Sequence, residues 1–177
     1  MDKKQDLAAK IDQATEAGEQ FAKLYYETYD KKRHVLHKLY LDTATMVWNG
    51  NGLSGLDNIQ KYLEGLPVSE HRMESLDCQP LSDWTYYGMV SGPSGQDTDE
   101  TVNSRILQLG TFDHNDERKM PILFQDKVSG GQFSIIVKTY GTVKYQNRKP
   151  KTFHQNFMLT SQNNLWKVVS DSFRFQD

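Results

Sequence analysis

Six side chains in the sequence have the types that acid–base chemistry uses. A tyrosine close to a carboxyl or imidazole group in a pocket could transfer protons to and from a substrate. The candidates are Tyr25, Tyr26, Asp42, His71, Asp77 and Asp171. No two of them have a spacing that is diagnostic of a catalytic pair. Tyrosines on a helix face usually form core, and aspartates at turns or in strands usually bond to nearby backbone. The sequence therefore assigns no catalytic residue.

Metal and cofactor sites are not predicted either. The single Cys78 cannot form an internal disulfide, and no Cys/His cluster has the spacing of metal ligands. We interpret Cys78 as a small, buried or half-buried hydrophobic residue. The expectation is that the chain needs no metal and no cofactor.

A more informative group is the guanidinium of Arg174, which stands between Phe173 and Phe175 near the C-terminus. The segment 165–177 is typical of a strand, in which successive side chains point to opposite faces. If the two phenylalanines fill a core, Arg174 stands on the outer face of the sheet. There it meets either water or the carboxylate of a partner, and we interpret it as a partner contact.

Composition and charge restrict the class of protein. The 177 residues, 37% of them hydrophobic and 25% charged, fit one soluble globular domain. The formal net charge of −2 gives no positive field for nucleic acid. No apolar run could span a bilayer, and the first residues do not have the apolar core of a secretory signal. We therefore expect a protein of the cytosol or nucleus.

The first third of the chain is predicted to be mainly helical. A 3–4 spacing places six residues on one stripe of a long helix, where small Ala14 and Gly18 would let a sheet come close. The stripe is Leu7, Ile11, Ala14, Gly18, Phe21 and Tyr25. A short helix over 33–41, a strand over 43–48 and a turn at 49–52 follow. Ser54 to Asp57 is typical of a capping box that opens a third helix, which stops at Pro67.

The last third is predicted to form long antiparallel strands. One face of the first strand is shared by Phe133, Ile135, Val137, Thr139, Val143 and Tyr145. A turn at 147–150 leads to a second strand over 151–162, and the 165–177 strand closes the chain. Helices followed by a meander indicate an α+β fold, with helices on one face of a bent sheet.

Between these parts lies a long acidic segment. Residues 82–131 carry eight acidic and four basic side chains, and 91–100 has the composition of a disordered linker. A stretch of this length without clear elements favours an insertion rather than part of the fold. The expectation is a single domain over 1–177 with a largely disordered inserted loop at 84–128.

The second of the long strands leaves two registers open. Either Gln155 and Phe157 or, one residue over, His154, Asn156 and Met158 face outward with Arg174. Because periodicity alone does not choose between them, the candidate partner-interface residues are Arg174, Asn156, Gln155 and Phe157.

Ordered motifs along the chain resemble one known family, the nuclear transport factor 2-related export proteins. These are the small cofactor subunits of the metazoan mRNA export receptor. The resemblance covers about 4–80 and 131–177, but the family does not show a segment like 84–128. It is carried by the segments 21–26, 30–33, 39–40, 43–51, 66–67, 77–80, 141–145, 157–160, 166–171 and 173–177.

The resemblance implies a cone-shaped α+β domain in which three helices pack into the concave side of a curved antiparallel sheet. It implies a non-enzymatic cofactor of nuclear mRNA export that pairs, sheet face against sheet face, with the related domain of the large nuclear RNA export factor. In this family the arginine of the terminal Phe-Arg-Phe motif forms an ion pair with an aspartate of the large subunit, a role that carries to Arg174.

The same resemblance implies contact with Phe-Gly (FG) repeats of nucleoporins and shuttling between nucleus and cytoplasm through the nuclear pore. RNA recognition would belong to the large subunit, so neither direct nucleic-acid binding nor membrane binding is expected of this chain.

Two alternatives remain open. One is a homodimeric carrier for the small GTPase Ran, like nuclear transport factor 2 itself, although Arg174 would then face a like charge across a two-fold axis. The other is an enzyme, because the cone fold also hosts isomerases and dehydratases.

The run from Asp30 to Arg33 has two possible roles. It could contact RNA or act as a localisation signal, but a solvated helix end is the favoured interpretation. Trp48 is likewise interpreted as strand-end packing rather than as a stacking platform.

Overall fold

The computed structural model describes residues 3–81, 134–162 and 165–176. The predicted inserted loop at 84–128 and Phe133 lie outside these ranges, so their order stays a prediction. The elements in chain order are α1 (Lys3–Lys31), the 3-10 helix η1 (Arg33–Leu39), β1 (Tyr40–Trp48), β2 (Asn51–Ser54), α2 (Leu56–Glu64), β3 (Ser69–Pro80), β4 (Ser134–Tyr145), β5 (Lys151–Gln162) and β6 (Leu165–Gln176).

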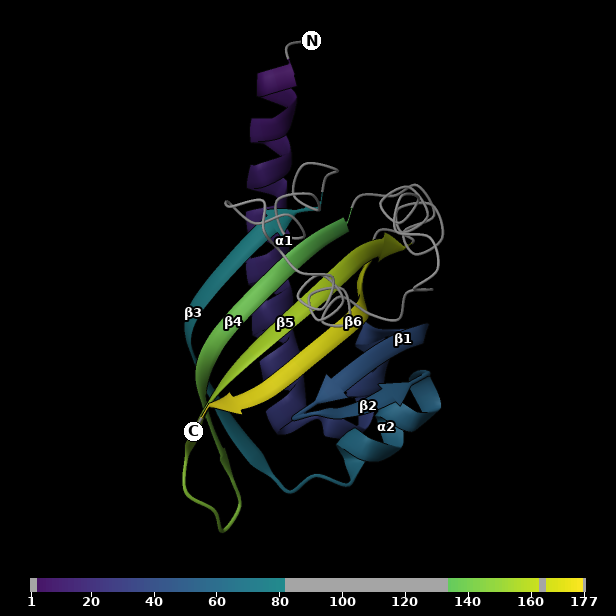
Figure 1. The fold of residues 1–177 in the computed structure, drawn as a ribbon, viewed down its shortest axis with the longest axis vertical. Coiled ribbons are helices and arrows are strands. Elements are labelled where there is room, and N and C mark those ends of the chain that lie inside the picture. Colours follow the sequence, from purple (N-terminus) through teal and green to yellow (C-terminus); the bar gives the residue numbers. More distant parts are fainter. Residues whose placement is uncertain (1–2, 82–133, 163–164, 177) are drawn as a thin grey trace, which may run out of the picture.

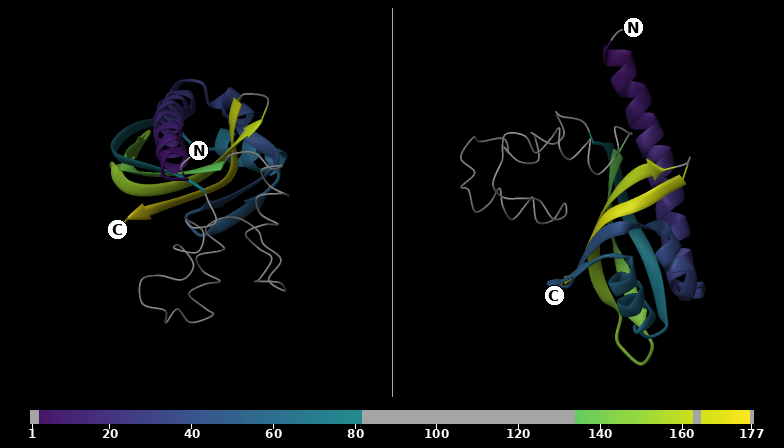
Figure 2. Two further views of the ribbon diagram at one scale, coloured as in Figure 1. Left: turned by 90° about the horizontal axis from the view of Figure 1, so that it is seen from above. Right: turned by 90° about the vertical axis from the view of Figure 1, so that its right-hand side faces the viewer.

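The described strands form one curved sheet in the order β2-β1-β6-β5-β4-β3. Helix α1 runs along its concave side, and α2 lies near β1 and β2 (Figures 1 and 2). The prediction of a wholly antiparallel sheet is wrong at one pair, because β1 and β6 are parallel. After β1 and its hairpin partner β2, the chain passes through α2 to β3 at the far edge of the sheet. The strands β3 to β6 then pair antiparallel, each with the next, so that β6 lies beside β1 and runs in the same direction.

The predicted stripe of α1 packs on the sheet from Ala14 to Tyr25, but the prediction is wrong at Ile11, and the side chain of Leu7 lies outside the described residues. Ala14, Phe21 and Tyr25 are buried, while Ile11 is 43% exposed because the first turns of α1 extend beyond the sheet (Figure 1). Gly18 is the point of closest approach, since a Cβ there would lie 2.9 Å from Cys78 Cβ and would overlap Cys78 Sγ. The small residue in the stripe thus sets the distance between helix and sheet.

Three local predictions for residues 33–57 need correction. The segment after α1 is a 3-10 helix that ends at Leu39, and Tyr40 already belongs to β1. The turn is confined to Asn49 and Gly50, which both have positive φ, so Asn51 begins a short strand that pairs back on β1. Gly55, with φ 84°, occupies the N-cap of α2 without a side-chain cap bond, so the capping box is wrong. Ser54 cannot cap the helix because it lies in β2.

The strand β4 alternates as predicted from Val137 onward, but Ser134 and Ile136, which are out of phase with the inner residues, are also buried. Ile135, Val137, Thr139, Val143 and Tyr145 are buried against the helices. Lys138 and Lys144, one residue out of phase with them, are exposed on the convex face. The core therefore fills the space between this inner face of the sheet, α1 and α2.

The basic run after α1 has a structural role that the sequence did not suggest. Lys31 and Lys32 are exposed, as expected of a solvated helix end, but Arg33 is partly buried. Its guanidinium donates to the carbonyl oxygens of Leu63, Leu66 and Pro67 at 3.1, 2.9 and 2.8 Å. Its Nε donates to the carbonyl oxygen of Tyr29 at 2.8 Å. Arg33 thus holds the end of α1 and the segment after α2 together.

The close approach at Gly18 gives a prediction whose sign is opposite to that of helix propensity. In an exposed helix, Gly→Ala stabilises by about 1 kcal/mol. Here Gly18→Ala should lower the free energy of unfolding by about 1–3 kcal/mol, because the new methyl group overlaps Cys78. Urea unfolding measures the change.

Two further variants serve as controls for this prediction. Glu19→Ala, at the next and exposed position, should be close to neutral. Cys78→Ala combined with Gly18→Ala should restore part of the lost stability, because Sγ is the nearest overlapping atom. A more stable Gly18→Ala protein would contradict the packing argument.

Candidate functional site

The convex face of the sheet carries Arg174 as expected from the alternation of β6. Phe173 is buried and stacks on Phe153 and Trp48, with ring centroids 5.2 and 5.3 Å apart. Arg174 is exposed on the opposite face. Its guanidinium has no hydrogen-bond or ion-pair partner in the part of the chain that the structure describes. A permanent positive charge is therefore available on this face.

Arg174 does not stand alone on its face. The strand register places it directly opposite His154 on β5, which in turn stands opposite Tyr140 on β4. The rings of Tyr140 and His154 lie 4.9 Å apart, and His154 is exposed. Three side chains that can donate hydrogen bonds thus form one row across three strands, and such a row suits a partner surface that is rich in carboxylates.

The register of β5 separates the other candidate interface residues. Asn156 is partly exposed on the convex face, opposite Lys138 and Ser172. Gln155 and Phe157 are only 2% and 1% exposed and point to the concave side, so the register that placed them outward is wrong. The physical reason is that α1 covers that side of β5: Phe157 packs edge-on against Phe21 at 5.2 Å.

The exposed part of the convex face is polar. The exposed large hydrophobic side chains of the described residues are Ile11, Leu24, Val68, Met73 and Leu165. None of them belongs to the rows through Asn156 and Arg174. Any complex on this face would therefore depend on hydrogen bonds and charge as well as on apolar contact.

A second cluster of polar side chains lies in the core, between α1 and the sheet. Asp171 on β6 accepts from Tyr40 Oη at 2.6 Å, from Gln155 Nε2 at 2.8 Å and, more weakly, from Tyr25 Oη at 3.4 Å. Tyr26 Oη donates to Gln155 Oε1 at 2.8 Å. We call these five residues the tyrosine–aspartate network.

Burial governs the electrostatics of this network. It raises the pKa of Asp171 from 3.8 to about 6, although the hydrogen bonds from Tyr40, Gln155 and Tyr25 act in the opposite direction. Burial also raises the pKa of Tyr25 and of Tyr40 well above 10, and the nearby Asp171 carboxylate adds to the effect. The tyrosines are therefore hydrogen-bond donors at neutral pH, and Asp171 is the group that titrates.

The network combines residue types that an acid–base enzyme would use, but its position does not favour catalysis. Asp171 is 1% exposed, and neither described cavity is lined by Asp171, Tyr25 or Tyr40. A substrate would have to reach a carboxyl group that α1 covers. The arrangement can hold α1 on the sheet, and it can couple stability to pH.

The remaining acid–base candidates lie elsewhere. Asp42 and Asp77 are exposed on β1 and β3. His71 pairs with Asp30, whose Oδ1 lies 2.7 Å from His71 Nδ1 and whose Oδ2 accepts from the His71 backbone N–H. Burial would raise the pKa of Asp30, but the hydrogen bonds from His71 and Ser69 outweigh it and lower the pKa. This pair ties β3 to the end of α1.

Sequence reasoning missed Tyr40, and it missed the inward role of Gln155. A usable signal was present, because Gln155 and Asp171 each stand between apolar residues that share the inner face of a strand. A polar residue at such a position must find a buried partner.

Metal and membrane binding receive no support from the described residues. No group of three or more His, Cys, Asp or Glu side chains among them could hold a metal ion. None of the helices in these ranges is long and apolar enough to cross a membrane.

Comparison with known proteins identifies related chains. The family model of the nuclear transport factor 2 (NTF2) domain matches residues 17–119 and 109–175. NTF2-related export protein 2 of Homo sapiens is 36% identical, over 97% of this chain and 94% of that protein. NTF2-related export protein 1 of Bos taurus is 34% identical, over 97% and 95%.

A solved structure of similar fold is that of nuclear transport factor 2 from Cryptosporidium parvum. Its TM-score is 0.60 at 20% identity, and the match covers 93% of this chain and 95% of that one. At this identity the likeness supports the fold.

The raised pKa of Asp171 predicts how stability depends on pH. The folded state favours the protonated carboxyl, so this group's contribution to stability is complete below about pH 4 and is lost as the pH rises through about 6. The difference between 3.8 and about 6 corresponds to about 3 kcal/mol. Between about pH 4 and pH 7 the wild type should therefore lose up to this amount relative to Asp171→Asn, which does not titrate.

Urea unfolding of both proteins over this pH range is the measurement, and Asp77→Asn, at an exposed position, is the matched control. If the difference between wild type and Asp171→Asn is the same at all pH values, burial does not perturb Asp171.

Proposed function

Because the chain belongs to the nuclear transport factor 2 (NTF2) family, we propose that it is a non-enzymatic cofactor of nuclear mRNA export. It pairs through its convex sheet face with the related domain of a large nuclear RNA export factor. The observation that carries this proposal is the exposed guanidinium of Arg174, which has no partner among the described residues and stands in a row with His154 and Tyr140. The names of the relatives as NTF2-related export proteins support the export role.

In this mechanism the row of Tyr140, His154 and Arg174 is buried against a surface of the partner that carries carboxylates. Arg174 meets an aspartate or glutamate of the partner, and His154 and Tyr140 supply further hydrogen bonds beside it. Desolvation offsets much of the attraction within such a pair, so the pair contributes mainly to specificity. A protein without this acidic residue would bury the Arg174 guanidinium without a counter-charge, which disfavours binding.

The completed heterodimer supports docking to FG nucleoporins at the nuclear pore, and the chain shuttles between nucleus and cytoplasm. RNA is bound by the large subunit, so this chain contributes stability and docking rather than RNA recognition. No cofactor, metal or membrane takes part.

Two other functions can be separated from this one. A homodimeric carrier for a small GTPase would bring two Arg174 side chains to one symmetric interface, where like charges disfavour pairing. A cone-fold isomerase or dehydratase would use the tyrosine–aspartate network, and the raised pKa of Asp171 is the observation in its favour. The burial of Asp171 without an adjoining cavity counts against it.

The first test is charge reversal at the interface. Arg174→Glu should abolish a one-to-one complex with the NTF2-like domain of a nuclear RNA export factor, because it removes a buried pair and places two acids together. Loss of one member of such a pair costs roughly 3–5 kcal/mol, which corresponds to roughly 10²- to 10⁴-fold weaker binding. Co-expression, size-exclusion chromatography with light scattering, and calorimetry measure the complex.

Lys23→Glu, the same charge change at an exposed position of α1, is the matched control and should leave binding unchanged. A wild-type chain that forms a homodimer and no mixed complex would favour the GTPase carrier instead. Equal affinity of wild type and Arg174→Glu for the partner would show that Arg174 is not part of the interface.

A second test separates the two faces of β5. Asn156→Lys should weaken the complex at least tenfold and lower the free energy of unfolding by no more than about 1 kcal/mol, because its side chain is partly exposed and the new ammonium group faces Lys138 on β4. Phe157→Ala should instead lower the free energy of unfolding by about 3–5 kcal/mol, because it leaves a cavity under α1.

Unfolding curves and binding isotherms of both variants provide the comparison. Full affinity in Asn156→Lys would place the partner on another surface of the molecule.

A further inference from the structure

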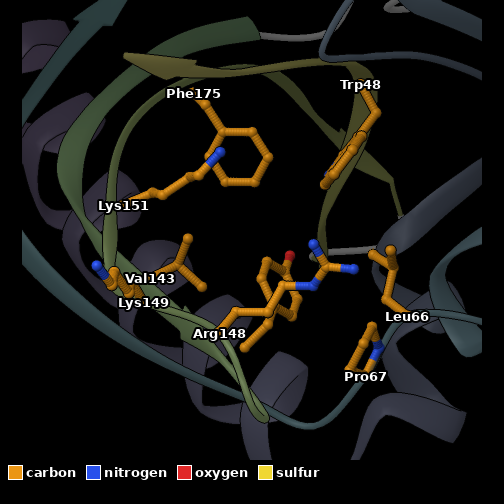
Figure 3. A pocket seen from close by; sticks show the side chains of 9 residues that line it. Trp48, Leu66, Pro67, Val143, Arg148, Lys149, Lys151 and Phe175 are labelled. Carbon is orange, nitrogen blue, oxygen red and sulfur yellow. The ribbon is translucent and has the colours of Figure 1, made fainter. Parts of the chain in front are cut away.

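A cavity of about 470 Å³, which we call the mouth cavity, lies on the concave side of the sheet, where β1, β4 and β6 end and β5 begins. Trp48 and Phe175 line one side, and Leu66 and Pro67, from the segment after α2, line another (Figure 3). Val143 on β4 adds a further apolar side chain. The cavity is large enough to accept an apolar or aromatic side chain.

Hydrogen bonds preform the walls of this cavity. Arg33 fixes the carbonyl oxygens of Leu66 and Pro67. Gln146 N donates to Val68 O at 2.8 Å, which ties the turn between β4 and β5 to the same segment. A ligand would therefore meet a largely rigid site, which lowers the entropic cost of binding.

The rim of the cavity is strongly basic. Arg148 and Lys149 come from the turn between β4 and β5, and Lys151 begins β5. Figure 3 shows Arg148 extending across the opening toward Leu66, while the Lys151 amine lies near the Phe175 ring, 5.1 Å from its centroid. None of the described residues that line the cavity is acidic, so Arg148, Lys149 and Lys151 give its rim a net positive charge.

We propose that this mouth cavity is a docking site for an acidic linear peptide of a partner protein, with one apolar or aromatic residue flanked by carboxylates. The apolar side chain enters between Trp48 and Leu66, and the flanking carboxylates pair with Arg148 and Lys151. The assignment rests on two matches: the basic rim suits carboxylates, and the apolar interior suits an apolar side chain. The site lies on a different surface from Arg174, so a negative result for the peptide would leave the proposed heterodimer untouched, and the reverse also holds.

The lining favours a peptide over a nucleotide. Sequence-specific recognition of a base requires hydrogen-bonding groups at its edge, and the interior presents apolar side chains. Binding of a base by stacking alone requires a free ring face, and one face of Trp48 is already stacked on Phe173 at 5.3 Å. Among the lining residues that the structure describes, only Tyr145 carries a hydroxyl, and it already bonds to Tyr29 Oη at 2.8 Å. The cations alone would attract RNA or peptide equally, so the interior decides the class of ligand.

The test measures binding of a fluorescein-labelled peptide, Gly-Ser-Glu-Glu-Phe-Glu-Glu-Ser-Gly, to the full-length chain by fluorescence anisotropy. Replacing the phenylalanine of the probe by alanine should weaken binding at least tenfold. The protein variant Arg148→Glu with Lys151→Glu should do the same, because both positions are exposed and tolerate a change of charge. The matched control, Lys23→Glu with Lys144→Glu, carries the same net charge away from the cavity and should bind as the wild type does.

The location is checked by the indole N–H signal of Trp48 in two-dimensional NMR, assigned with Trp48→Phe. Nε1 of Trp48 has no acceptor among the described residues, so its signal should move when the peptide enters. Absence of saturable binding at millimolar peptide would overturn the proposal. So would equal affinity of the alanine probe, or tighter binding of an oligouridylate that the Arg148 and Lys151 variant also weakens.

Discussion

The fold depends on satisfying the hydrogen bonds of Asp171 in the core. Its carboxyl group lies where α1 meets the sheet, and donors reach it from α1, from the start of β1 and from β5. An unpaired carboxylate at this depth would cost several kcal/mol, so these elements must come together in one arrangement. The network fixes the position of α1 on the sheet together with the close contact between Gly18 and Cys78. The pairing of β6 with β1 and the position of Tyr40 both follow from this constraint.

Arg33 and Arg174 show that the surroundings of an arginine decide what its charge does. Arg33 is surrounded by carbonyl oxygens of its own chain and acts as a structural clamp. Arg174 points to the face of β6 opposite to that of Phe173 and Phe175, because side chains alternate along a strand. The described residues of its own chain offer it no acceptor. The same side-chain chemistry therefore closes the fold in one place and leaves a charge for recognition in the other.

The molecule offers two surfaces of different character, on opposite sides of one sheet. The exposed part of the convex face is polar, with a donor row from Tyr140 to Arg174. The mouth of the cone is concave and apolar with a basic rim. Because the sheet is a single layer, its inner residues hold α1, while Lys138, Asn156 and Arg174 on the outer face are at least partly exposed. The fold can thus combine a stabilising partner on one side with a transient ligand on the other.

The sequence by itself determined most of the alternation of the long strands, the presence of a turn after Trp48, the close approach at Gly18 and the opposition of Arg174 to Phe173. These follow from local periodicity and from the conformational needs of single residues. Tertiary structure decided which side of β5 faces α1, and so turned Gln155 and Phe157 inward. It also brought Tyr40 to Asp171 across 131 residues and made β1 parallel to β6. Periodicity tells which residues share a face, but only long-range packing decides what covers that face.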